Sequence, residues 1–234
     1  GQGAPFMVWV ALPDGTTFPL PEIQTAEVQV IHNAADLAAD TVDIYVIDAI
    51  GDVIATLDDV AFRTNTDFLE LPSTVPLTIA VAPGNSTSAA DSVASIPVQL
   101  ETDSTYIAIA NGIVSGSGYT PAPAFGLDIF VGARKQAANQ GASEVDVLVY
   151  HGATDAPTVD VASGGNTLVD DISYGEFQGY LTLPEADYVI DLQDAGGTTL
   201  LSYQAPLQTL SLADNALTVL ASGFLTPADN SNGP

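Results

Sequence analysis

The sequence contains no cysteine, and its 234 residues include only three lysine or arginine residues and two histidines. Without cysteine there can be no disulfide, no thiol nucleophile and no cysteine-ligated zinc. Without clustered cations, nucleic acid is not an expected partner, because phosphate binding depends on Lys and Arg. No apolar run reaches the roughly 18 residues of a membrane-spanning helix, so we expect no membrane insertion.

Acidic residues dominate the charge. Asp and Glu number 29, which gives a net charge of −26 and a pI near 4.1. Copies of such a chain should repel one another in dilute salt. Screening should relieve that repulsion, because the Debye length is only about 8 Å at physiological ionic strength.

Short runs that alternate between apolar and polar residues recur along the chain, separated by clusters of Gly, Pro, Asn and Asp. Examples are residues 27–31, 42–46, 106–110 and 145–149. Many short strands at close spacing, in a chain that is 47% hydrophobic, are typical of β-sandwiches. The sequence therefore predicts an all-β protein.

The two halves of the sequence repeat each other, which predicts two tandem copies of one module. The matching segments are Val30–His32 with Val149–His151, Thr41–Ile44 with Thr158–Val161, Phe68–Pro72 with Tyr180–Pro184, and Ile109–Gly112 with Leu220–Gly223.

This repeat predicts four segments. We expect an N-terminal apolar strand and linker over residues 1–25 and a first sandwich over 26–131. A linker over 132–144 and a second sandwich over 145–234 follow.

The repeat extends upstream of each module. Residues 6–10 correspond to residues 125–129, and in both copies the phenylalanine precedes the histidine of the module by 26 residues. Each copy therefore contains one short apolar strand ahead of its linker.

The pattern V-x-V-x-H-x-x-x-D-x-P-x-V-D-V, followed by an aromatic-Leu-x-Leu-Pro motif and a late strand ending in Ala-x-Gly, resembles the bacterial domain-of-unknown-function family 4397. Residues 147–161 are the closer match, whereas residues 30–44 lack the Asp-Ala-Pro and contain two extra residues. The resemblance implies tandem immunoglobulin-like or transthyretin-like sandwiches in exported, often surface-attached bacterial proteins. It implies an extracellular or cell-surface location and no established activity.

A histidine and two aspartates recur in each module. These repeat-signature residues are His32, Asp36, Asp43, His151, Asp155 and Asp160. A histidine beside two carboxylates could act as a base or bind a metal. Repetition of the same unit, without a second His, Cys or Ser nearby, favours instead a structural role in which the imidazole holds the following loop. We therefore expect no catalytic residues and no enzyme.

No cofactor or metal is expected, with calcium as the alternative. The aspartates of residues 36–52, and the pairs at 58–59 and 170–171, could supply oxygen ligands. No EF-hand spacing is present, so a solvated acidic face is the favoured interpretation.

The apolar strands point to self-assembly. Residues 125–131 should fold back on residues 106–114 and complete the first module. The second module would need the same strand after residues 216–225, and none follows in this sequence. Residues 6–12 of another copy would then be the donor, which gives a head-to-tail filament.

The expected donor residues are Phe6, Met7, Val8, Trp9, Val10, Ala11 and Leu12. The expected acceptor residues are Ala216, Leu217, Thr218, Val219, Leu220 and Phe224.

The alternative is a self-contained monomer in which each strand belongs to the module that follows it. Such a surface stalk or adhesion module would bind carbohydrate or a surface protein. Its contacts would be Tyr119, Tyr174, Phe177 and Tyr180, although packing in the core or between strands is the favoured interpretation of these aromatic residues.

Overall fold

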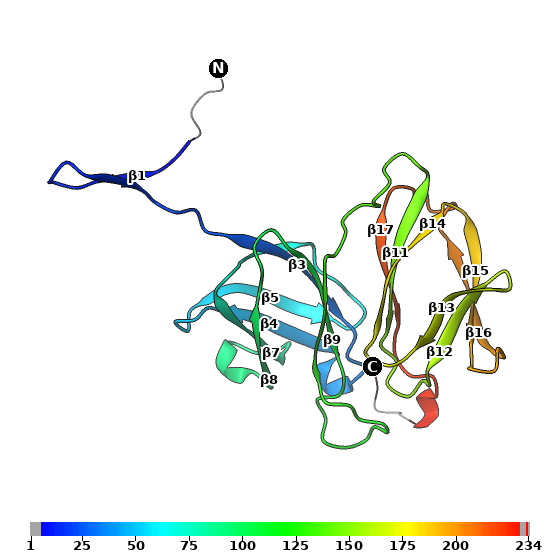
Figure 1. The fold of residues 1–234 in the computed structure, drawn as a ribbon. Helices are drawn as coiled ribbons and strands as arrows, with labels where there is room; N and C mark the ends of the chain where they lie inside the picture. Colours follow the sequence, from blue (N-terminus) through cyan, green and yellow to red (C-terminus); the bar gives the residue numbers. More distant parts are fainter. Residues whose placement is uncertain (1–5, 230–232, 234) are drawn as a thin grey trace.

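The computed structural model describes residues 6–229 and 233 (Figure 1). Residues 1–5, 230–232 and 234, at the ends of the expected first and last segments, lie outside the described residues. The fold is all-β, as the sequence predicts, and its helical structure in the described residues is confined to three 3-10 helices. These are Leu37–Ala39, Ala89–Asp91 and Pro227–Asp229.

The first module is a sandwich of two four-stranded sheets, in the orders β10-β9-β3-β6 and β5-β4-β7-β8. The strands of the first sheet are β10 (Gly126–Val131), β9 (Thr105–Asn111), β3 (Thr25–His32) and β6 (Leu69–Pro72). The strands of the second sheet are β5 (Val53–Ala61), β4 (Thr41–Ile47), β7 (Pro76–Pro83) and β8 (Ala94–Gln99).

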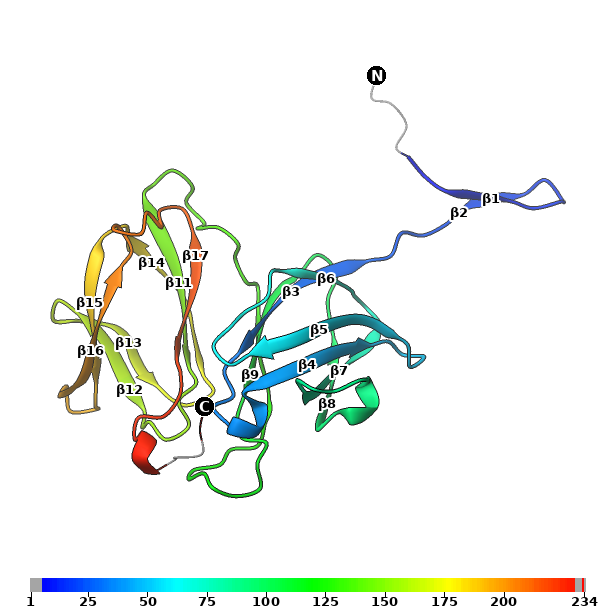
Figure 2. The ribbon, with the colours of Figure 1, turned by 180° about the vertical axis from the view of Figure 1, so that it is seen from behind.

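The second module repeats this arrangement with one strand fewer. Its sheets have the orders β14-β11-β17 and β13-β12-β15-β16 (Figure 2). The strands of the smaller sheet are β14 (Phe177–Pro184), β11 (Glu144–His151) and β17 (Ala216–Ala221). The strands of the larger sheet are β13 (Asn166–Ile172), β12 (Val159–Ser163), β15 (Asp187–Gln193) and β16 (Thr199–Pro206).

In each module the first strand pairs in parallel with a late strand, β3 with β9 and β11 with β17. In the first module, alternate residues such as Val28, Val30 and Ala108 point into the sandwich and pack with Ile44 of the opposite sheet. A fully buried aliphatic side chain contributes roughly 1.5–3 kcal/mol, so these interiors can hold the modules together without disulfides.

β10 closes one side of the first module. It folds back as expected and pairs antiparallel with β9, with Leu127 opposite Ala110 and Ile129 opposite Ala108. β10 also contacts β8 of the second sheet. It therefore covers the opening between the edges of the two sheets.

The N-terminal segment forms a hairpin that projects away from both modules (Figure 1). β1 (Trp9–Ala11) pairs antiparallel with β2 (Thr17–Pro19). The turn contains Asp14, whose carboxylate accepts hydrogen bonds from the backbone and hydroxyl of Thr16, and Gly15 at φ +87°, which is favourable turn chemistry. The region after residue 12 was expected to be only a linker, but it supplies the second strand of this hairpin.

The second expected linker, residues 132–144, is attached to the second module. The amide of Ala137 donates to the carbonyl of Asp214 at 2.9 Å, and the amide of Gly141 donates to the Asp214 carboxylate at 2.8 Å. β11 begins within this range, at Glu144. The segment is therefore a fixed part of the junction between the modules.

Within the described part of the chain, no helix has the length and apolar character needed to span a membrane.

Candidate functional site

The two signature histidines each bind the loop that follows them. Nε2 of His32 lies 2.6 Å from the carbonyl oxygen of Ala39, and Nε2 of His151 lies 3.0 Å from that of Pro157. The amide of Ala34 donates to Nδ1 of His32 at 3.4 Å, which fits a neutral ring with its proton on Nε2. Burial lowers the pKa of His32, and this also favours the neutral form of the ring. Both imidazoles thus have a structural contact at equivalent places.

The first signature aspartate of each module holds the segment that follows β9 or β17. The carboxylate of Asp36 accepts from the amides of Val114 at 2.8 Å and Ser115 at 2.6 Å. Asp155 accepts from the amides of Leu225 at 2.7 Å and Thr226 at 2.8 Å. The same contact therefore recurs in both modules, as a structural signature should.

Asp36 is fully buried. Its burial alone would raise its pKa, but hydrogen bonds from Ser115, Ala38 and Tyr119 outweigh that effect and hold the pKa below its usual range.

The second signature aspartate holds a strained position on the neighbouring strand. Asp43 accepts from the amide of Asp59 at 3.0 Å, and Asp160 accepts from the amide of Asp171 at 2.7 Å. Asp59 and Asp171 both have φ +53°, a conformation that non-glycine residues adopt rarely. The carboxylates therefore stabilise equivalent irregular positions in β5 and β13.

One group of carboxylates could hold a cation. Oxygen atoms of Asp43, Asp58 and Asp59 lie within 4.8 Å of one another. A hydrogen bond to Asp43, with the charges of Asp43 and Asp59, raises the pKa of Asp58. Among the described residues, Asp43 is the one aspartate of the 36–52 stretch that belongs to this group, and Asp170 and Asp171 do not belong to it. A cation, or a proton held between Asp43 and Asp58, would relieve the repulsion among these carboxylates.

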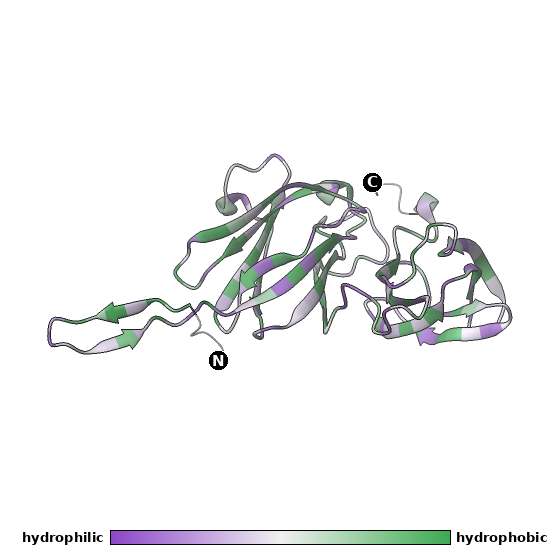
Figure 3. Cartoon of the chain, turned by 90° about the horizontal axis from the view of Figure 1, so that it is seen from above, coloured by the Kyte–Doolittle hydropathy of each residue, from purple (hydrophilic) through white to green (hydrophobic). Residues whose placement is uncertain are grey.

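The N-terminal hairpin exposes an apolar face. Val10 lies opposite Phe18 in the ladder, and the amide of Leu20 donates to the carbonyl of Val8 at 2.8 Å. These four side chains share one face, because directly paired residues project to the same side. Phe6, which is 89% exposed, extends the same alternation. Figure 3 shows hydrophobic residues along both hairpin strands, with no other element against them.

The second module has an open edge, which we define as the unpaired side of β17 together with Val219, Leu201 and Tyr203. β17 pairs only with β11 among the described strands. On β16, Leu201 and Tyr203 lie opposite Leu192 and Ile190, which belong to the interior. Leu201 and Tyr203 must therefore point inward, yet Tyr203 is 57% exposed.

Equivalent positions of the two modules show what the open edge lacks. Ala108 in β9 and Val219 in β17 correspond in the repeat and both face the sandwich interior. Ala108, beside β10, is 5% exposed, whereas Val219 is 49% exposed. The second module thus exposes an interior position that β10 covers in the first.

The expected acceptor residues fall mainly on this edge. Residues 216–220 lie in β17. Phe224 lies beyond the end of the strand and stacks on Tyr119 of the first module, with ring centroids 5.9 Å apart. Phe224 therefore belongs to the contact between the modules, and its expected position on the edge is wrong.

The modules pack through the outward faces of two sheets. Ile31, Ile107 and Ile109 of the first module form one buried cluster with Leu148 and Tyr150 of the second. Sequence reasoning missed this interface, although β9 and β11 contain a signal for it. Both strands have apolar residues on both faces, a pattern typical of strands buried on both sides.

Aromatic residues complete the interface. Phe130 packs against Phe177 at 5.5 Å and against Tyr180 at 5.8 Å, and Tyr150 packs against Phe177 at 4.6 Å between ring centroids. Phe177 and Tyr180 were candidates for exposed ligand contacts. The structure places them in the junction instead, because β10 lies against β14.

The other two candidates are also enclosed. Tyr119 is buried and its hydroxyl donates to Asp36 at 3.0 Å. Burial raises the pKa of Tyr174 to about 12. None of the four expected aromatic contacts therefore projects freely from a loop.

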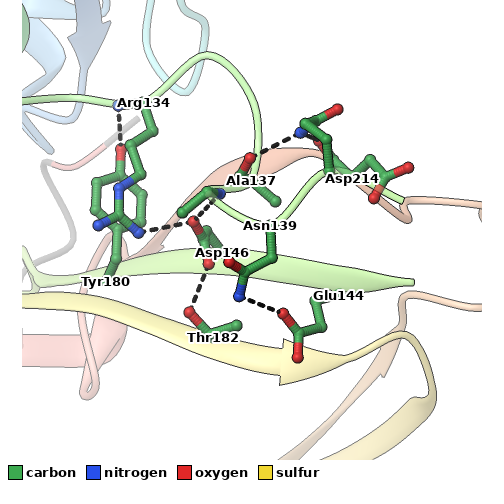
Figure 4. A network of polar contacts seen from close by, with 10 residues as sticks. Arg134, Ala137, Asn139, Glu144, Asp146, Tyr180, Thr182 and Asp214 are labelled. Carbon is green, nitrogen blue, oxygen red and sulfur yellow. Dashed lines mark hydrogen bonds and ion pairs between the residues drawn. The ribbon is translucent and has the colours of Figure 1, made fainter. Parts of the chain in front are cut away.

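A buried carboxylate anchors the junction (Figure 4). Asp146 is fully buried and pairs with Arg134 at 2.7 Å. It also accepts from the hydroxyl of Thr182 at 2.7 Å and the amide of Ala138 at 2.8 Å. Burial alone would raise the pKa of Asp146, but these hydrogen bonds and the charge of Arg134 lower it overall. The carboxylate thus remains ionised and fully bonded.

A cleft of about 370 Å³ opens between the modules. All three cations of the chain, Arg63, Arg134 and Lys135, line it. Lys135 pairs with Glu27. Arg63 donates to the hydroxyl of Ser222 at 3.1 Å and to its carbonyl at 2.9 Å. Arg63 therefore joins the first module to the second, Lys135 joins the linker to the first module, and Arg134 joins the linker to the second module.

Residues 145–230 match the family model described as Domain of unknown function (DUF4397). The expected family resemblance is therefore confirmed over the second module. No curated protein matches the chain. One similar solved structure is described as "Alpha-glucan binding by a streptococcal virulence factor". It is 10% identical, with a TM-score of 0.25, over 83% of this chain and 93% of that one. At this identity and score the likeness carries no functional argument.

Proposed function

We propose that this chain, whose second module carries the DUF4397 domain, assembles head to tail into an extracellular filament. Residues 6–12 of one copy would add to the open edge of the second module of the next. The exposure of Val219, set against the burial of Ala108 beneath β10, is the observation that carries this proposal.

The first module supplies the register for the donated strand. Residues 6–12 correspond to residues 125–131 in the repeat. In the register of β10 on β9, Val10 falls opposite Val219 and Val8 falls opposite Ala221. Both valines then face the sandwich interior. Addition of a strand to a free edge satisfies the backbone while the alternate side chains fill the interior.

β2 need not separate from β1 for this contact to form. β1 pairs with β2 through one edge only, so its other edge can pair with β17. Phe18 lies on the same face as Val10. The whole apolar face of the hairpin would then extend toward Leu201 and Tyr203 of β16.

The contact joins two different surfaces, so a donor remains free at one end and an acceptor at the other. Such heterologous contacts build open chains unless the rotation happens to close. The charge of −26 opposes association, and salt should relieve that repulsion. We therefore expect more and longer assemblies as ionic strength increases.

No enzymatic activity is part of the proposal. The imidazoles and carboxylates of the repeat signature bond to backbone groups at matching places in both modules. A carbohydrate partner stays a prediction, now without its expected aromatic contacts.

The test is sedimentation velocity with negative-stain electron microscopy over a range of protein and salt concentrations. We expect thin fibres with an axial repeat of one two-module subunit. The double variant Val8→Asp/Val10→Asp should abolish them, because an isolated buried carboxylate costs several kcal/mol.

The matched control is Val53→Asp/Ile54→Asp. It makes the same chemical change at two exposed positions of β5 and should assemble like the parent chain. Compact two-lobed particles at every condition, or fibres that persist in the Val8/Val10 variant, would contradict strand donation.

A further inference from the structure

The inter-module cleft lies beside the open edge of β17. Outward-facing residues of β17, Thr218 and Leu220, line the cleft from the second module, and Ile31 and Phe68 line it from the first. Its volume of about 370 Å³ is within the range of ordinary binding pockets. Any strand that extends the sheet beyond β17 would place its own outward-facing side chains at this cleft.

Arg63 is the cation of the cleft that lacks an acidic partner. Arg134 and Lys135 pair with Asp146 and Glu27, whereas no carboxylate of the described residues lies within 4.0 Å of Arg63. Its guanidinium bonds to Ser222, just beyond the end of β17. A positive charge without a carboxylate thus lies where a strand added to β17 would pass.

The register of the donated strand places an aromatic residue at the same point. Asp128 lies opposite Ile109 in the first module, and the corresponding pair in the assembled edge is Trp9 opposite Leu220. Directly opposed residues project to one face, with Cβ atoms about 4.5–5.5 Å apart. Trp9 is the only tryptophan of the chain and is 55% exposed.

We propose that Trp9 of the donated strand enters the inter-module cleft of the accepting copy and packs against Arg63, Phe68 and Leu220. This inference rests on the proposed function and deepens it. Tryptophan is the best aromatic partner for a cation above its ring, and the apolar side of the cleft can receive the rest of the indole.

The accepting site would therefore be composite. The second module provides the open edge for Val8 and Val10, and the first module provides Arg63 and Phe68 for Trp9. The fixed junction between the modules keeps the two parts in register. The site recognises residues 6–12 of a second copy through both faces of the strand.

Trp9 reports directly on its own position. Because the chain has one tryptophan, emission excited beyond the absorption band of its eight tyrosines comes from Trp9 alone. We expect the emission maximum to shift to shorter wavelength and iodide quenching to fall as the protein assembles with rising concentration. In Val8→Asp/Val10→Asp, emission should stay that of an exposed indole at all concentrations.

A double-mutant cycle tests the partner. Trp9→Leu and Arg63→Gln should each weaken association, and the cycle should show a coupling of about two- to fivefold in the association constant, the size of an exposed cation–π contact. Ser222→Ala controls for loosening of the junction. It removes the hydroxyl bonded to Arg63 but keeps the cation, so its coupling to Trp9→Leu should be absent.

The outcomes separate the two ideas. Fibres in which Trp9 stays fully open to iodide, or an additive cycle, would overturn the Trp9 inference while leaving strand donation intact. Absence of assembly under all conditions would overturn both. Protection of Trp9 together with the coupling to Arg63 would establish the composite site.

Discussion

The two modules share one topology and differ at one edge. The sheet of the first module ends in β10, and the corresponding sheet of the second ends in β17. The consequence is visible in one pair of equivalent positions, with Ala108 covered and Val219 exposed. Within the described residues, one copy of the repeat is thus a completed sandwich and the other exposes an interior position at its edge.

The largest difference between the two edges is expected from the same substitution at the two equivalent positions. Ala108→Asp should lower the unfolding free energy of the first module by about 3 kcal/mol or more, because it places an unpaired charge in the interior. Val219→Asp should cost the isolated chain less than about 1 kcal/mol but abolish assembly. Calorimetry of dilute protein with sedimentation measures both. Equal destabilisation by the two variants would show that the edges do not differ.

A smaller difference is expected from the signature aspartates. Asp36 is buried and bonds to Val114 and Ser115, with further donors, whereas Asp155 bonds to two amides near the surface. Asp36→Asn should cost about 2–3 kcal/mol and Asp155→Asn about 1 kcal/mol, since bonds to charged groups are worth roughly 1.5–3 kcal/mol when buried. Hydrogen exchange of each module, followed by mass spectrometry, assigns the loss to the correct module.

The pKa of Asp36 also predicts an acid limit. Because its pKa is lower in the folded than in the unfolded chain, its contribution is present above about pH 4 and disappears as the pH falls through the folded value. Asp36→Asn should therefore make the first module less sensitive to acid below pH 4. An unchanged pH profile in that variant would contradict the assignment.

A second pH-dependent effect is expected at His32. Burial lowers its pKa in the folded state, so the unfolded chain binds more protons below about pH 6.5, and stability should fall as the pH decreases from there. The slope can reach about 1.4 kcal/mol per pH unit. His32→Gln should flatten it between pH 6.5 and 5, as measured by denaturant unfolding. Retention of the full slope would assign it to other groups.

Much of the fold follows from local sequence. Period-two alternation located the strands, and the repeat revealed that residues 125–131 close the first module. β2 escaped prediction because Thr17–Pro19 lies in a proline-rich stretch, which argues against a strand by propensity. Its pairing depends instead on the turn at Asp14 and Gly15.

The sequence indicated the exposed apolar strands of the candidate site but not the cleft between the modules. The repeat drew attention to residues 6–12 and to β17, because both contain local apolar runs, and the structure shows that both contain exposed residues. The inter-module cleft could not be predicted, since it forms where Arg63, Phe68 and Leu220 meet from segments far apart in the chain. Packing was the favoured interpretation of Tyr180, but its partner Phe130 in the first module could not be named, because the two meet only in the folded junction.

The junction and the hairpin also bear on mechanics. The modules are joined by an apolar contact and by the hydrogen bonds of Arg63 to Ser222, so each subunit should behave as one stiff rod. Between β2 and β3, residues 21–23 are fully on the surface and form no ladder. A fibre linked through β1 would therefore consist of stiff two-module units joined by short linkers at residues 21–23. Its bending and its response to pulling would depend on these few residues.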